Sequence, residues 1–152
     1  MKDSSDTASE LRARALRLLA RREHSRAELA RKLAAHAASR EALDELLDGL
    51  AARRQLSDER YAEERTRQLA RKYGAGRIRH DLVARGVDAA TAARLAAASG
   101  RDDLARARAI LERKYRSPAT TAQERAKRMR FLQARGFDHD VIRQVLSSLR
   151  AD

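Results

Sequence analysis

The residues with the clearest chemistry in this chain are two runs of arginine and lysine. The first run has one acidic residue, Asp81, among the cations Arg67, Arg71, Lys72, Arg77, Arg79 and Arg85. The second run has no acidic residue among the cations Arg125, Lys127, Arg128, Arg130 and Arg135. Positive charge gathered in this way attracts phosphates or acidic protein surfaces, so the two runs predict a polyanionic partner.

The charge of the whole chain points the same way. Its 152 residues hold 34 Lys and Arg against 22 Asp and Glu, a net charge of +12. The candidate binding residues are Arg71, Lys72, Arg77, Arg79, Arg125, Lys127, Arg128 and Arg130. The alternative is that some of these cations pair with Glu63, Glu64 or Glu124 on solvated helix faces.

No residue pattern of an enzyme accompanies this charge. The four histidines, His24, His36, His80 and His139, are dispersed, and none lies in a His-Glu-x-x-His metal motif. The chain has no cysteine, and Gly74-Ala-Gly76 lacks the Lys-Ser/Thr of a phosphate-binding loop. We therefore expect no catalysis, no ATPase, no metal and no cofactor, and we interpret the histidines as surface residues.

A repeated segment indicates how the cations are positioned. Leu82-Val-Ala-Arg-Gly-Val-Asp88 returns as Leu132-Gln-Ala-Arg-Gly-Phe-Asp138. In each copy glycine can end one helix in the left-handed conformation, and aspartate can cap the next helix. Upstream, Leu69-Ala-Arg-Lys-Tyr73 returns as Leu111-Glu-Arg-Lys-Tyr115, with a weaker version at Leu19-Ala-Arg-Arg-Glu23. The period of roughly fifty residues is typical of a tandem repeat.

No segment alternates apolar and polar residues as a strand would, so the predicted fold class is all-α. We expect three tandem three-helix, helix-turn-helix-like repeats in an elongated, curved array. The predicted repeats cover residues 9–56, 57–100 and 101–152, after a disordered tail at residues 1–8. Apolar side chains spaced by three and four residues form the predicted core faces, as with Leu43, Leu46, Leu47 and Leu50, and in the last helix with Val141, Ile142, Val145, Leu146 and Leu149.

Individual residues predict where single helices begin, end and face the core. Ser25 and Glu28 have the spacing of a capping box, and a long helix through Tyr61 should run to about Tyr73. Ile78, Leu82 and Val83 should anchor the next helix, and the helix after Asp88 offers mostly alanine to its core. Free N–H groups at Gly74-Ala-Gly76 should favour an anion by about 0.3 to 1 kcal/mol.

The few aromatic residues, Tyr61, Tyr73, Tyr115, Phe131 and Phe137, have two interpretations. They could stack on single-stranded bases, but packing in the core or at helix ends is the stronger interpretation because the chain has no tryptophan. The polar N-terminus predicts neither a signal peptide nor a membrane span. We expect a monomer in the cytoplasm.

Four segments resemble the RecX family in order and spacing. They are residues 22–33, 56–62 and 73–82, and Lys114-Tyr115 followed by Phe131-Leu-Gln-Ala-Arg-Gly-Phe137. The resemblance implies three three-helix repeats and a regulator of the RecA recombinase in homologous recombination and DNA repair. It implies binding to the RecA–DNA filament, with single- and double-stranded DNA contacted regardless of sequence, and restraint of RecA ATPase and strand exchange.

Two other functions remain open from the residues alone. One is a general or sequence-specific helix-turn-helix DNA-binding protein, with the helix from Arg77 to Arg85 in the major groove. That helix has no Gln or Asn to read bases, which argues against sequence-specific reading. The other is a helical repeat that binds only protein.

Overall fold

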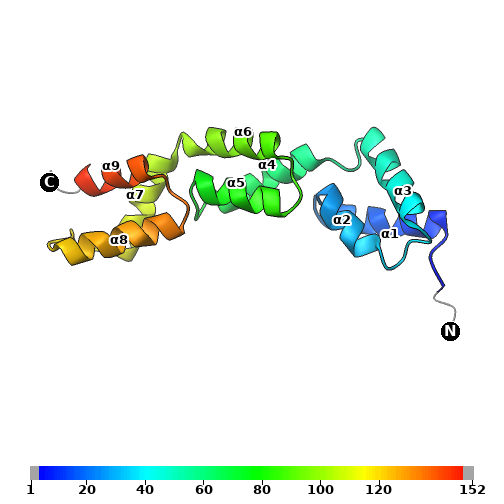
Figure 1. Cartoon of the computed structure of the whole chain (residues 1–152), viewed down its shortest axis with the longest axis horizontal. Coiled ribbons are helices and arrows are strands. Elements are labelled where there is room, and N and C mark those ends of the chain that lie inside the picture. The colour runs from blue at the N-terminus through cyan, green and yellow to red at the C-terminus, as the bar shows by residue number, and fades with distance from the viewer. Residues whose placement is uncertain (1–3, 149–152) are drawn as a thin grey trace. The chain divides into compact units, whose positions relative to one another are not determined.

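The computed structural model describes residues 4–148, and within them every regular element is a helix. These are α1 (Ala8–Arg21), α2 (Arg26–Leu33), α3 (Arg40–Ala52), α4 (Asp58–Leu69), α5 (Ala75–Ala84), α6 (Ala89–Gly100), α7 (Asp103–Lys114), α8 (Ala122–Ala134) and α9 (His139–Ser148) (Figure 1). No strand occurs in residues 4–148, so the predicted all-α class is confirmed.

The chain forms two compact units. Unit 1 extends to Glu64 and includes Ala84–Val87, whereas unit 2 contains Arg65–Val83 and continues from Asp88. The division falls inside α4, and the turn after α5 belongs to unit 1 because it contacts α2. The two compact units therefore differ from the three predicted repeats, because the turn after α5 packs with unit 1. The boundaries predicted for the three repeats remain predictions.

Unit 1 has a leucine core supplied by α1, α2 and α3. Its buried side chains recur at helical spacing, as the sequence predicts, and they are Leu11, Ala15, Leu29, Leu33, Leu43, Leu47, Leu50 and Leu56. Leu46 packs against this cluster from a partly buried position.

The start of α1 differs from the prediction of a disordered tail at residues 1–8. Thr7 caps α1 in a full capping box with Glu10, and the Asp6 carboxylate lies 2.9 Å from Nε of Arg14. These contacts order the residues from Asp6 onward, so the predicted tail is too long. Residues 1–3 lie outside the described range.

The predicted capping box of α2 forms only in part. Ser25 Oγ accepts a hydrogen bond from the Glu28 N–H at 3.1 Å, but the Glu28 carboxylate turns to Arg22, with both oxygens 2.9 Å from guanidinium nitrogens. Arg22 therefore holds the pKa of this buried carboxyl below its usual value. An ion pair replaces the second half of the box.

Unit 2 corrects two expectations about α4 and α5. The helix predicted to reach Tyr73 ends at Leu69, because the N–H groups of Lys72 and Tyr73 both turn back to the Leu69 carbonyl. Ile78 and Leu82 are buried as expected. Val83 is 48% exposed, because it directly follows Leu82 on the helix and therefore points away from the core that Leu82 faces.

The rest of unit 2 follows the predicted pattern. Asp88 caps α6, whose buried side chains, Ala92 and Ala96, are both small. A second core joins α7, α8 and α9, with the buried residues Ala107, Leu111, Leu132, Phe137, Ile142 and Val145. Leu149, predicted on the last apolar face, lies outside the described residues.

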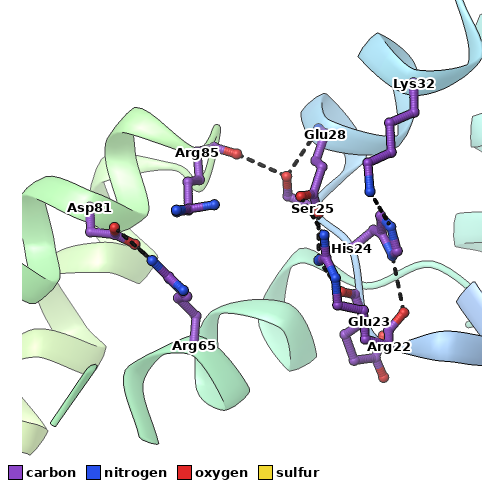
Figure 2. Close-up of polar contacts among 9 residues, drawn as sticks. All are labelled: Arg22, Glu23, His24, Ser25, Glu28, Lys32, Arg65, Asp81 and Arg85. Atoms are coloured by element: carbon purple, nitrogen blue, oxygen red, sulfur yellow. Dashed lines mark hydrogen bonds and ion pairs between the residues drawn. The ribbon is translucent and has the colours of Figure 1, made fainter. Parts of the chain in front are cut away.

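The repeated Ala-Arg-Gly turn makes the same kind of contact twice. In unit 1, Ser25 Oγ at the start of α2 donates to the Arg85 carbonyl at 2.8 Å (Figure 2). In unit 2, the Gly74 N–H at the start of α5 donates to the Arg135 carbonyl at 2.8 Å. In each turn the carbonyl of the residue that follows the helix thus accepts a hydrogen bond from the start of an earlier helix.

This docking overturns the expected anion site at Gly74-Ala-Gly76. The Gly74 and Gly76 N–H groups donate to the carbonyls of Arg135 and Gly136, and the Ala75 N–H donates to the Asp103 carboxylate at 2.9 Å. Asp103 is 2% exposed, and burial raises the pKa of its carboxyl. The chain supplies its own anion at this helix start.

His24 is also different from the predicted surface histidine. It is 1% exposed, and its Nδ1 lies 3.0 Å from the Arg22 carbonyl, to which it donates (Figure 2). Its Nε2 lies 3.0 Å from Nζ of Lys32, which can only donate, so the ring is neutral. Burial lowers the pKa of His24.

The glycines of the docking turns should tolerate no side chain. Gly86 and Gly136 have φ of +93° and +85°, and an added Cβ would lie 2.4 Å from Cβ of Ala27 or 2.3 Å from Cβ of Arg77. We expect Gly136→Ala and Gly86→Ala to lower the free energy of unfolding by roughly 2 to 5 kcal/mol through left-handed strain and overpacking. Urea denaturation measures the change.

Gly49→Ala is the matched control. Gly49 lies in α3 with open space around an added Cβ, so alanine should stabilise the protein by about 0.5 to 1 kcal/mol. Equal stability of Gly136→Ala and the wild type would contradict the docking role.

The neutral state of His24 predicts a loss of stability on acidification. Because the pKa of His24 is lower in the folded protein, the unfolded chain binds a proton more readily. The stabilisation by neutral His24 is therefore complete above about pH 6.5, and it is lost as the pH falls below that value. Urea denaturation at pH 7.5 and pH 5.5 should show lower stability at pH 5.5. His24→Gln should reduce that difference, and an unchanged difference would exclude His24 as its source.

Candidate nucleic-acid interface

The candidate cations near the end of α4 line a concave surface of unit 2, here called the basic groove. Arg71 and Lys72 follow α4, Arg113 and Lys114 end α7, and Phe131 and Arg135 belong to α8 and its C-cap. Together with Ile110 these residues enclose about 290 Å³. Five cations and no carboxylate line the groove, which is the charge pattern of an anion site.

Aromatic rings hold several of these cations in place. The Phe131 ring centroid lies 4.0 Å from Nζ of Lys114 and 5.0 Å from Cζ of Arg135. The Tyr73 centroid lies 5.8 Å from Cζ of Arg135, and 4.6 Å from Cζ of Arg77, which lies outside the groove. Such contacts position charged groups. Tyr61 and Phe137 are 4% exposed, which confirms core packing for those two residues.

The docking turn also fixes Arg135. Its carbonyl accepts from Gly74, and its Nη1 donates to the Lys72 carbonyl at 3.3 Å. The backbone after α4 and the C-cap of α8 are therefore joined at the edge of the basic groove. The hydrogen bonds that dock the turn bring these two groups of cations together.

Arg113, Lys114 and Arg135 were absent from the candidate set predicted from the sequence. The repeat contained the signal that would have identified two of them, since Arg71-Lys72 and Arg113-Lys114 occupy equivalent places in Leu69–Tyr73 and Leu111–Tyr115. Arg135 belonged to the second cationic run, but only its contact with Lys72 assigns it to the groove.

The other candidates do not share this groove. Arg77 and Arg79 are exposed on α5, and Arg77 donates to the Ala134 carbonyl at 3.3 Å. Lys127 and Arg130 are exposed on α8, whereas Arg125 lines a separate groove between α8 and α9.

Arg128 points inward. It is 7% exposed, its Cζ lies 4.3 Å from the Tyr115 ring centroid, and its Nη2 donates to the Ser117 carbonyl at 2.9 Å. These contacts brace the connection between α7 and α8, so binding a phosphate would require Arg128 to leave them.

The alternative pairing with Glu124 is not what the structure contains. The Glu124 carboxylate accepts hydrogen bonds from the backbone N–H groups of Thr120 and Thr121, which lower its pKa. Asp81 pairs at 3.0 Å with Arg65, which is not one of the candidate cations (Figure 2). Asp81, the single acid of the first run, is therefore already engaged.

Between residues 4 and 148, no three metal-binding side chains come together as a cluster. In the same range, no helix combines the length and hydrophobicity needed to cross a membrane.

The helices, the repeated docking turn and the basic groove define an all-helical repeat protein. Comparison with known proteins places it in a family. Models of the RecX family match residues 12–50, 57–94 and 101–146, described as the first, second and third three-helix domains. The chain therefore belongs to the RecX family.

Curated relatives agree over most of the chain. Regulatory protein RecX of Leptothrix cholodnii is 44% identical over 136 residues, covering 90% of this chain and 87% of that protein. Its counterpart in Herbaspirillum seropedicae is 42% identical, covering 93% and 92%. The crystal structure of RecX from Lactobacillus salivarius has the same fold, with a TM-score of 0.80 at 20% identity over 95% of this chain and 97% of that one.

The basic groove predicts a specific salt dependence. Arg71→Ala, Lys72→Ala and Arg113→Ala together should weaken binding to single-stranded DNA and reduce the slope of log affinity against log salt. Each lost phosphate contact removes about 0.7 from that slope, so the expected change is up to about 2. Fluorescence anisotropy with oligo-dT across salt concentrations measures it.

A control with the same loss of charge removes three exposed cations of unit 1, Arg21, Arg31 and Arg53. If the control and the groove variant lose equal affinity, total charge rather than the groove determines binding.

Proposed function

We propose that this protein regulates RecA by binding the RecA–DNA filament and restraining its ATPase and strand exchange. Membership of the RecX family supports the RecA partner, since its relatives are named as regulatory proteins. The observation that supports contact with DNA is the basic groove, which gathers five cations from three separate segments without a carboxylate.

The proposed contact to DNA reads phosphates and not bases. Phe131 and Tyr73 lie beside cations, so the rings hold charged groups rather than offering bare stacking platforms. Arginine and lysine contacts to phosphates position a protein without selecting sequence. Binding to single- and double-stranded DNA would then be independent of sequence.

The protein would act by binding and would carry no catalytic step of its own. Three helical domains in one chain can each add a weak contact, and linked contacts raise the overall affinity without any single strong one. We expect the protein to act as a monomer in the cytoplasm, where RecA is located.

The test is the single-stranded-DNA-dependent ATPase of the cognate RecA, titrated with this protein. We expect the ATPase to fall at ratios well below one molecule per RecA, more than sequestration of DNA explains. The Arg71, Lys72 and Arg113 triple alanine variant should inhibit less than the triple variant of unit 1. An unaffected ATPase beside strong, salt-dependent DNA binding would instead identify a general DNA-binding protein.

A further inference from the structure

A second concave surface of unit 2 lies between α8 and α9. Arg125 and Met129 line it from α8, and Asp140, Arg143, Gln144, Leu146 and Ser147 line it from α9. This α8–α9 groove encloses about 620 Å³, within the usual range of about 300 to 1,000 Å³ for ligand-binding pockets.

The α8–α9 groove has an apolar floor and a polar rim. Met129 and Leu146 are partly buried and pack against the core of α7, α8 and α9, so the floor continues that core. Arg125 lies one helical turn from Met129 on α8, and Gln144 presents an amide from α9. The lining can therefore accept an apolar side chain with polar groups beside it.

The charges of this rim distinguish it from the basic groove. Asp140 and Arg143 form an ion pair on α9, and their side chains are 72% and 64% exposed. Arg125 faces the same groove from α8, and no ion pair with it occurs among residues 4–148. A chain of phosphates in this groove would be repelled by the Asp140 carboxylate. A single carboxylate of a ligand could instead pair with Arg125.

We propose that the α8–α9 groove binds a segment of a partner protein in which a carboxylate lies beside an apolar side chain. The carboxylate pairs with Arg125, the apolar side chain covers Met129 and Leu146, and the Gln144 amide meets the partner's backbone. This inference rests on the proposed function for the partner, which is RecA in its filament. The basic groove then contacts phosphates, and the α8–α9 groove contacts protein.

The first experiment compares Arg125→Glu with Arg31→Glu, an equal charge reversal at an exposed residue of α2. Arg125→Glu should raise the concentration for half-inhibition of the RecA ATPase about tenfold, or 1.4 kcal/mol. Both variants should bind oligo-dT equally. Equal inhibition by the two variants, or a selective loss of DNA affinity in Arg125→Glu, would overturn the proposal.

The second experiment does not depend on the ATPase. Benzoylphenylalanine replaces Gln144 in one variant and Lys72 in the other, and each variant is irradiated with RecA filaments and with single-stranded DNA alone. Position 144 should cross-link to RecA and not to DNA, and position 72 should cross-link to DNA. Cross-links from position 144 to DNA, to a second copy of this chain, or to nothing contradict the proposal.

The two experiments separate the inference from the proposed function. Cross-linking of position 144 to RecA without ATPase inhibition by the wild type would support the groove and reject the regulation. Inhibition by Arg125→Glu as strong as that by Arg31→Glu would reject the groove and leave the regulation intact.

Discussion

The close approach of a helix-ending turn to the start of an earlier helix is the contact on which the rest of this structure depends. Gly86 and Gly136 leave no room for a Cβ at this approach, and both adopt a backbone conformation that other residues rarely adopt. The carbonyl before each glycine then accepts a hydrogen bond, from Ser25 or from Gly74. Hydrogen bonds to these two turn carbonyls therefore join short helices in addition to their buried side chains.

The same contact assembles the candidate site. Arg135 precedes Gly136, so the turn whose carbonyl is docked on Gly74 also places the Arg135 guanidinium on the Lys72 carbonyl, while Phe131 lies one helical turn before Arg135 on α8. The turn at Gly136 thus both stabilises unit 2 and positions cations of the basic groove. The light packing of α6, whose buried side chains are alanines, increases the importance of such backbone contacts in unit 2.

The cations of this chain differ in role because they differ in surroundings. Arg128 braces the α7–α8 connection from a buried position, and Arg125 shares its groove with a carboxylate and apolar side chains. Lys72 and Arg113 line a groove in which every charge is positive. A net charge of +12 therefore describes several surfaces with different partners.

The sequence by itself determined the all-helical class, the repeat, the family and the caps at Ser25 and Asp88, because periodicity and capping involve residues close together in the chain. It also indicated the Arg71-Lys72 part of the candidate site. Only the tertiary structure decided that α4 ends at Leu69, that His24 is buried, and that Arg113 and Arg135 join Lys72 in one groove. The groove in particular depends on contacts between residues far apart in the chain, such as Gly74 with Arg135, and local patterns do not encode such pairs.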